Sequence, residues 1–171
     1  MEQLLSASEF RSFHKIAKKA DDKVINESIL KAQQSDLISA LGDFYFDVLA
    51  NYQEDAYNDL MNGSTFEYEG YGYEQVGLKD LLSDYAYSRY LYNRNVNDTS
   101  FGVVNKVDPN SEAVDRNILK DISRQSQQDA GYKFKYIDLY LKANKETFPR
   151  YNRCDNVKEN MSYKTFKSTV F

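Results

Sequence analysis

Glycines and a lysine in residues 72–79, GYEQVGLK, come close to the pattern of a phosphate-binding loop. A P-loop needs its lysine directly after the second glycine and then a serine or threonine, because these groups reach the phosphates and their metal ion. Here Leu78 separates Gly77 from Lys79, and Asp80 follows the lysine. The acidic residues ahead of the loop would also repel a phosphate. We therefore interpret the segment as a flexible glycine loop before a helix.

Other groups that could do chemistry are few. His14, the single histidine, stands among basic residues without a serine, cysteine or carboxylate at a recognisable motif spacing, and we expect a solvated residue on a helix. Cys154, the single cysteine, has no partner for a disulfide and no motif that would make it a nucleophile. Carboxylate pairs such as Glu67 with Glu69 do not match a calcium loop. No enzyme activity, cofactor or metal site is predicted.

Length and composition favour a single soluble domain. The chain has 171 residues, and its 10 phenylalanines and 15 tyrosines supply a core that a disordered chain would lack. There is no run of about 18 apolar residues, as a membrane span needs, and no signal peptide at the start. We expect a protein without membrane association that is made in a cytoplasm.

Charge is distributed unevenly along the chain. Residues 43–84 hold ten acids and a single base, Lys79, whereas residues 85–171 hold ten acids and fifteen bases, within a net charge of −4. Surfaces of opposite sign would favour head-to-tail contact between copies. Alternatively, neighbours in space interleave the charges and cancel them.

Apolar residues at steps of three and four predict a mostly α fold, a bundle of about four to five helices. The expected helices cover residues from Ser6 or Ser8 to the lysines before Asp21, 22–41, 43–52, 78–95, and from about 110 to just before Pro149. Ser6 with Glu9 forms a capping-box pattern, Gly42 is expected to end the second helix, and Asp43 to cap the third. One seam of the last helix holds Leu119, Ile122, Ser126, Ala130, Phe134, Ile137 and Leu141, and one face of the preceding helix holds Leu82, Tyr85, Arg89 and Tyr92.

Two segments interrupt the helical pattern. Residues 62–77 contain four of the seven glycines, and Phe66 and Tyr68 alternate with glutamates, which predicts a β-like glycine-rich loop or hairpin entered at a turn of Asn62 and Gly63. Residues 97–110 are predicted to form an extended arm and turn. A helical domain of residues 1–149 is thus expected, followed by a basic, aromatic C-terminal tail of residues 150–171.

The tail interleaves positive and aromatic side chains without a periodic apolar face. It is interpreted as an arm that docks on a partner, and the alternative is a segment that binds nucleic acid by phosphate contacts and stacking. The acidic chain and the lack of a helix-turn-helix or RNP-type motif favour the arm. The candidate docking residues are Arg150, Tyr151, Arg153, Tyr163, Lys164, Phe166, Lys167 and Phe171.

Five segments in succession carry a resemblance to a known family. They are AQQSDLISALGDFYFDVL (residues 32–49), YNDLMNG (57–63), GLKDLLSDYAYSRYL (77–91), TSFGVV (99–104) and YLKANKETFPRYN (140–152). In this order and spacing they resemble the head-tail connector proteins of tailed phages, which act as portal adaptors or head completion rings, in the variant carried by phages of gut bacteria, including crAss-like phages. The resemblance covers about residues 25 to 152.

The resemblance implies a non-enzymatic virion protein at the head-tail junction, assembled in the host bacterial cytoplasm. Copies would form a homo-oligomeric ring, a dodecamer, that docks on the portal protein and meets the next adaptor, stopper or tail protein. DNA would pass through its channel without specific binding, past channel-lining candidates Glu67, Glu69 and Glu74. Candidates for an arm between subunits are Phe101, Val103 and Val104. A tail-completion ring and a small helical nucleic-acid-binding regulator are the alternatives.

Overall fold

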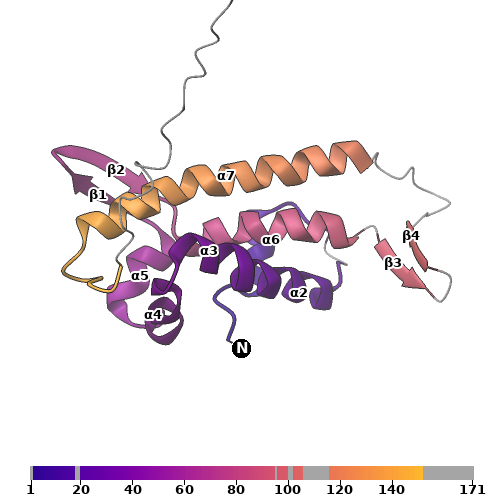
Figure 1. Cartoon of the computed structure of the whole chain (residues 1–171), viewed down its shortest axis with the longest axis horizontal. Helices are drawn as coiled ribbons and strands as arrows, with labels where there is room; N and C mark the ends of the chain where they lie inside the picture. The colour runs from indigo at the N-terminus through magenta and orange to yellow at the C-terminus, as the bar shows by residue number, and fades with distance from the viewer. Residues whose placement is uncertain (1, 18–19, 95, 100–101, 106–115, 152–171) are drawn as a thin grey trace, which may run out of the picture.

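The computed structural model describes residues 2–17, 20–94, 96–99, 102–105 and 116–151 (Figure 1). The chain is mostly α-helical, as predicted, with small antiparallel β-hairpins. Helix α6 (Leu78–Arg94) lies in the middle, between α2 (Asp22–Ala32) and α7 (Arg116–Ala143), and α7 runs along one edge of the molecule (Figure 1). Of the described helices, none is long and apolar enough to cross a membrane.

The first two helices begin at polar caps, of which Ser6 was predicted, but the first helix ends at Phe13 and not at the predicted lysines. Helix α1 (Ala7–Phe13) starts after Ser6, whose hydroxyl accepts from the backbone N–H of Glu9 while the Glu9 carboxylate accepts from the backbone N–H of Ser6, which confirms the capping box. Helix α2 starts after Asp21, whose carboxylate accepts from the backbone N–H of Lys23. The local polar groups therefore determine both starting points.

A π-helical turn, Gln33–Leu37, joins α2 to α3 (Ile38–Leu41), so the long predicted helix is continuous up to Gly42, which has a φ of 60°. The fully buried Gln33 at the start of this turn accepts from the backbone N–H of Leu4 at 2.9 Å. Its amide donates to the carbonyl of Glu2 and to the hydroxyl of Tyr45. This amide fastens the N-terminal segment to the core, a role that apolar spacing does not reveal.

Two short helices follow. Helix α4 (Phe44–Asn51) was predicted, although the side chain of Asp43 makes no capping bond. Helix α5 (Asp55–Asn62) was missed, because eight residues with a small apolar set give little periodicity. Its buried residues Tyr57, Leu60 and Met61 belong to the core, and it brings the described helical stretches to one more than expected.

The interface between α6 and α7 follows the predicted seam only in part. The seam is buried at Ser126, Ala130, Phe134, Ile137 and Leu141, but Ser123 takes the place of Ile122, which is 41% exposed. On α6, Leu82 is buried as predicted, whereas Tyr92 is 54% exposed and does not belong to the core face. Hydroxyl contacts make up this part of the interface: Ser88 and Ser123 share a hydrogen bond of 2.7 Å, and Ser126 donates to the carbonyl of Asp84. Small side chains here allow the two helices to approach closely.

The chain returns to the core after α7. Phe148 is 1% exposed and Tyr151 is 5% exposed, with the ring of Phe44 5.3 Å from that of Tyr151. The hydroxyl of Tyr151 donates to Asp138 on α7. Tyr151, predicted to dock on a partner, is therefore a core residue, and the helical domain extends past the predicted boundary at residue 149. The ring contact with Phe44 and the hydrogen bond to Asp138 outweigh the polar sequence around Tyr151.

Candidate functional site

The glycine-rich segment forms a β-hairpin. Strand β1 (Ser64–Tyr68) pairs antiparallel with β2 (Tyr71–Gln75), with Phe66 opposite Tyr73 and Glu67 opposite Gly72. The strand prediction is confirmed. Gly63 ends α5 directly before β1, at the predicted entry to the strand, and the hairpin itself turns at Glu69, which has a φ of 52°.

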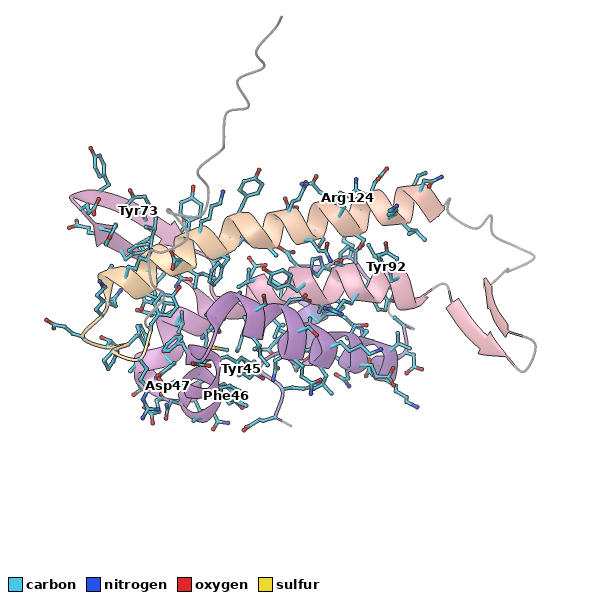
Figure 2. All side chains as sticks on the ribbon, viewed as in Figure 1. Tyr45, Phe46, Asp47, Tyr73, Tyr92 and Arg124 are labelled. Carbon is cyan, nitrogen blue, oxygen red and sulfur yellow. The ribbon has the colours of Figure 1, made fainter. Side chains whose placement is uncertain are left out.

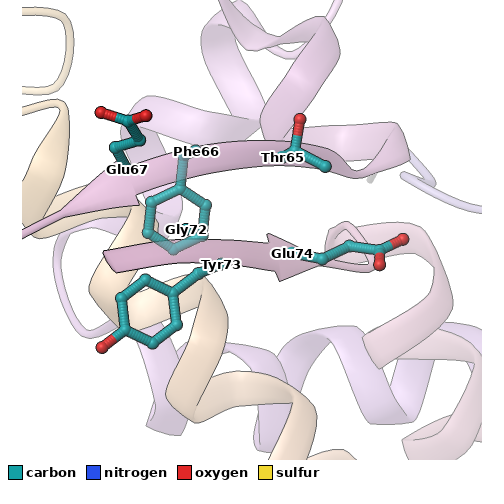
Figure 3. Close-up of a pocket in the computed structure, with 6 residues that line it drawn as sticks. All are labelled: Thr65, Phe66, Glu67, Gly72, Tyr73 and Glu74. Atoms are coloured by element: carbon teal, nitrogen blue, oxygen red, sulfur yellow. The ribbon is translucent and has the colours of Figure 1, made fainter. Parts of the chain in front are cut away.

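The two faces of this hairpin differ in chemistry, because side chains alternate along a strand. Phe66 and Tyr73 point to one side as a stacked pair, with 5.6 Å between ring centroids (Figure 3). The ring of Tyr140 on α7 packs edge-on against Phe66 at 5.4 Å. The other side carries Glu67 and Glu74, both exposed (Figure 3). We call this side, with Glu69 at the turn, the acidic face of the hairpin.

The base of the hairpin is held by close backbone contacts. A Cβ atom at Gly77 would lie 2.5 Å from the carbonyl oxygen of Met61, so no other residue fits there. The buried Gln75 accepts from the backbone N–H of Gly77 at 2.7 Å and donates to the carbonyl of Asp59 at 2.6 Å. The segment is therefore a hairpin pinned at its base, which agrees with the hairpin predicted for residues 62–77 and not with the flexible loop predicted for residues 72–79.

The two groups that could have bound a phosphate in this segment already have partners within the protein. The ammonium of Lys79 pairs with the carboxylate of Glu9 at 2.8 Å, and the N–H of Gly77 is taken by Gln75. Partial burial would raise the pKa of Glu9, but hydrogen bonds from Lys79 and Ser6 outweigh it and lower that pKa to about 2. The N–H of Gly77 and the ammonium of Lys79 are therefore not free to hold a phosphate.

The acidic face is an exposed, negatively charged surface of the hairpin. Six residues line a shallow, open depression on the hairpin: Thr65, Phe66, Glu67, Gly72, Tyr73 and Glu74 (Figure 3). Within the described ranges, no three His, Cys, Asp or Glu side chains are grouped so as to hold a metal ion. What the exposed carboxylates can do is repel polyanions and attract positive groups.

The hairpin, α6 and α7 all lie within the part of the chain that a family model matches. The match covers residues 37–161 and is to a family of unknown function, DUF6712. The chain belongs to DUF6712. Helices α1 and α2 lie before the region that this DUF6712 protein shares with the family model. No curated protein and no solved structure matches the chain.

The single histidine of this DUF6712 protein is not solvated, contrary to the prediction. The side chain of His14, just after α1, is 15% exposed and stacks on Tyr87 of α6, with 4.3 Å between centroids and 6° between planes. Its Nε2 lies 3.6 Å from a carboxylate oxygen of Asp84. Burial lowers the pKa of His14, so the ring is neutral at pH 7. The sequence around His14 is basic and contains no pattern that would predict its contact with Tyr87 or Asp84.

A buried charge network joins α6 to α7 beside this histidine. The ammonium of Lys133 lies 2.7 Å from a carboxylate oxygen of Asp84 and 2.9 Å from one of Asp80. Burial raises the pKa of Asp84, whose side chain is 8% exposed, although Lys133 partly offsets that. Burial would lower the pKa of Lys133, but its bonds to Asp84 and Asp80 raise it. The ion pairs of Lys133 offset the charges of the two carboxylates and join α6 to α7, so the network is a structural clamp between the two helices.

The remaining predicted site residues are only partly described. Arg150 is exposed, and its guanidinium lies 2.9 Å from the Asp47 carboxylate of α4, so it belongs to the domain like Tyr151. The arm candidates Val103 and Val104 lie in β4 (Gly102–Asn105), which pairs with β3 (Val96–Thr99) in a second hairpin. The other predicted docking and arm residues lie outside the described residues: Phe101, Arg153, Tyr163, Lys164, Phe166, Lys167 and Phe171.

Proposed function

We propose that this protein is a structural virion protein, a head-tail connector subunit that forms an adaptor ring under the portal and continues the DNA channel toward the tail. The observation that carries the proposal is the ordered succession of five segments between residues 32 and 152 that resembles such connectors. In this proposal the helices form the bundle of the subunit, and copies of it close into a dodecameric ring at the head-tail junction.

The acidic face of the hairpin supports the channel assignment. Glu67 and Glu74 point away from the core, and the described chain offers no ion-pair partner to either. Carboxylates that line a channel repel the phosphates of DNA, so a duplex slides past them without adhering. Glu69, at the tip of the hairpin, extends this surface.

The partners in this proposal are the portal protein on one side and the next adaptor, stopper or tail protein on the other. The docking arm now begins after Tyr151, since Arg150 and Tyr151 are held by α4 and α7. The ring is assembled in the host bacterial cytoplasm and needs neither cofactor nor membrane.

Co-sedimentation with the portal assembly of the same genome tests the proposal, read out as copies bound per portal. We expect saturation at a ring-like copy number for the full chain, and no attachment for a chain that ends at Tyr151, because the docking arm is removed while the core is kept. Failure of the full chain to bind contradicts the connector assignment. Normal attachment of the shortened chain contradicts the role of the arm.

Two other outcomes identify the alternatives. A protein that binds the tail assembly instead of the portal is a tail-completion ring. A protein that binds duplex DNA with an affinity that falls steeply with added salt is a nucleic-acid-binding regulator, because each phosphate contact releases counterions.

Reversal of the acidic face gives a separate prediction. Replacing Glu67 and Glu74 by lysine is expected to leave ring formation on the portal unchanged but to lower phage titre about tenfold or more, because DNA would adhere to the channel. The matched control replaces Glu27 on α2 and Glu146 after α7, which are exposed and change the net charge equally. Equal phage titres for the two double variants would contradict the assignment of the hairpin to the channel lining.

A further inference from the structure

One nitrogen of the His14 ring is buried without a hydrogen bond to any described residue. This atom is Nε2, so the ring N–H that donates to the backbone of Ser83 belongs to the other nitrogen, Nδ1. A neutral imidazole carries a proton on one nitrogen only, and the proton on Nδ1 leaves Nε2 as an acceptor. A buried acceptor that lacks a donor is unfavourable, and it is a place where the protein can bind a further proton.

The group that faces Nε2 is the carboxylate of Asp84 on α6. Its Oδ1 atom lies 3.6 Å from Nε2, and its side chain is 8% exposed. Its Oδ2 atom lies 2.7 Å from the ammonium of Lys133, so Oδ1 is the oxygen that meets the ring. An unprotonated imidazole nitrogen and a carboxylate oxygen are both acceptors, and they repel each other unless a proton lies between them. A single proton would convert this contact into a hydrogen bond.

The charged groups of α6 and α7 around this pair are mostly acidic. Helix α7 lies alongside α6, and the side chains of the two helices meet between them (Figure 2). Asp80 and Asp84 of α6 share one cation, Lys133 of α7, and the negative charge of Asp129 on α7 also acts on Asp84. Three carboxylates thus stand against one ammonium in this group, so one more proton brings it closer to neutrality.

The charged groups on the other elements near the ring are engaged elsewhere. On α1, the carboxylate of Glu9 pairs with Lys79, and the guanidinium of Arg11 pairs with Asp22 of α2. Lys15, the residue after the histidine, is exposed to solvent. The described charges that face the ring are therefore those of α6 and α7.

The pKa shifts of the two groups agree with a proton that they share. Burial lowers the pKa of His14 below its ordinary value of 6.5, and burial raises the pKa of Asp84 above 3.8. Two ionisable groups this close titrate as a unit. The pair therefore takes up its first proton between these two values.

We propose that His14 and Asp84 form one proton-binding site, in which a single proton taken up from mildly acidic solution joins Nε2 to the Asp84 carboxylate. The site connects the residue after α1 to α6, so it fastens the first helix to the core. It goes beyond the proposed function and does not depend on it.

Acidification weakens the docking of α1, and Asp84 limits that weakening. When α1 separates from α6, His14 enters solvent and takes up its proton near pH 6.5, whereas the docked ring takes up a proton only at lower pH. Docking is therefore strongest above pH 6.5 and weakens as the pH falls, until the docked pair has bound its own proton. Because Asp84 stabilises the protonated ring, it brings that point closer to neutral pH.

Titration of the single histidine tests the site in the purified full-length chain without a histidine tag. Nuclear magnetic resonance of the ring nitrogens follows His14 alone between pH 8 and pH 4. We expect a wild-type midpoint below 6.5 and, in Asp84→Asn, a midpoint about one pH unit or more lower, a tenfold or greater loss of proton affinity, because the amide has no charge to hold the proton. The control Glu27→Gln removes an exposed carboxylate of α2 and should leave the midpoint unchanged.

The wild type alone supplies a second measurement that does not depend on the folding of a variant. At pH 7.5 the nitrogen spectrum should show a proton on Nδ1 and none on Nε2, and below the midpoint Nε2 should carry a proton. Four results would each overturn the site: a proton on Nε2 at pH 7.5, a midpoint at or above 6.5, a ring that stays neutral down to pH 4, and an unchanged midpoint in Asp84→Asn.

Hydrogen exchange of the α1 amides tests the consequence for the helix. After correction for the intrinsic exchange rate, the increase in exchange from pH 7.5 to pH 5 should be about threefold larger in Asp84→Asn than in the wild type, because the variant ring resists protonation more strongly while it is docked. An equal effect of pH on the two chains would contradict the role of Asp84 in holding α1, since a purely structural defect would not depend on pH in this range.

Discussion

Replacing Lys133 by methionine should lower the free energy of unfolding by about 3 kcal/mol at pH 7. The substitution keeps most of the side-chain volume but removes the cation that lies 2.7 Å from the buried carboxylate of Asp84 and 2.9 Å from Asp80. A buried charge that loses its partner is strongly destabilising, by about 3–5 kcal/mol in comparable sites, and we take the lower end because Lys133 is 27% exposed. Urea unfolding followed by circular dichroism measures the loss.

The loss should shrink as the pH is lowered. Burial already raises the pKa of Asp84 above its ordinary value of 3.8, and removal of Lys133 takes away the group that opposes this rise. A carboxyl group with a raised folded-state pKa is favoured when protonated, so the variant recovers stability relative to the wild type as the pH falls through that raised pKa. A difference that stays constant between pH 7 and pH 4 would contradict this explanation.

Two further variants isolate the charge effect. Lys135→Met, two residues along α7, removes an exposed cation and is expected to change stability by less than about 0.5 kcal/mol. Adding Asp84→Asn to Lys133→Met should restore part of the loss, since the uncompensated charge is then removed. A single-variant loss below about 1 kcal/mol would show that the clamp contributes little.

Replacing Phe148 by alanine is expected to lower the free energy of unfolding by about 3–5 kcal/mol, the range for a large aromatic side chain removed from a core. Phe148 is 1% exposed, and its ring lies 5.2 Å from that of Tyr57, 5.9 Å from Phe44 and 6.0 Å from Tyr140. The substitution leaves a cavity where α4, α5 and α7 meet the returning chain. Thermal and urea unfolding of the purified variant give the measurement.

Phe46→Ala is the matched control, because this phenylalanine on α4 is 60% exposed. In dilute solution, where copies do not associate, it should change stability by less than about 0.5 kcal/mol. A Phe148 variant as stable as the Phe46 variant would show that residues beyond α7 are dispensable for the fold. The prediction would then be wrong.

Much of the helical framework could be predicted because local signals carry it. Ser6 and Glu9 satisfy the free backbone groups of a helix start within four residues, and Gly42 takes a positive φ at a helix end. The spacing from Ser126 to Leu141 identifies a buried seam, and the alternation of Phe66 with Glu67 identifies a strand. The acidic face was also predictable, since a period of two places its glutamates opposite the aromatic side chains.

Other features depended on partners far away in the sequence. His14 was expected in solvent, but Asp84 and Tyr87, seventy or more residues later, surround it. Tyr151 was expected in a docking arm, but Phe44 and Asp138 hold it in the core. The apolar periodicity gives no indication that Gln33 is buried. Its role in holding the N-terminal segment depends on the hydrogen bonds of its side-chain amide with Leu4 and Tyr45.

The sequence by itself determined the mostly helical class, most helix limits, the hairpin and the uneven charge, because each depends on neighbours within a few residues or on composition. Only the tertiary structure decided which polar groups are buried and which apolar groups remain outside. It placed Lys133 between two aspartates of α6 and left Tyr132 of α7 and Phe46 of α4 exposed. Burial is a property of packing between distant segments, and the free energy of an ion pair or a ring contact depends on that packing.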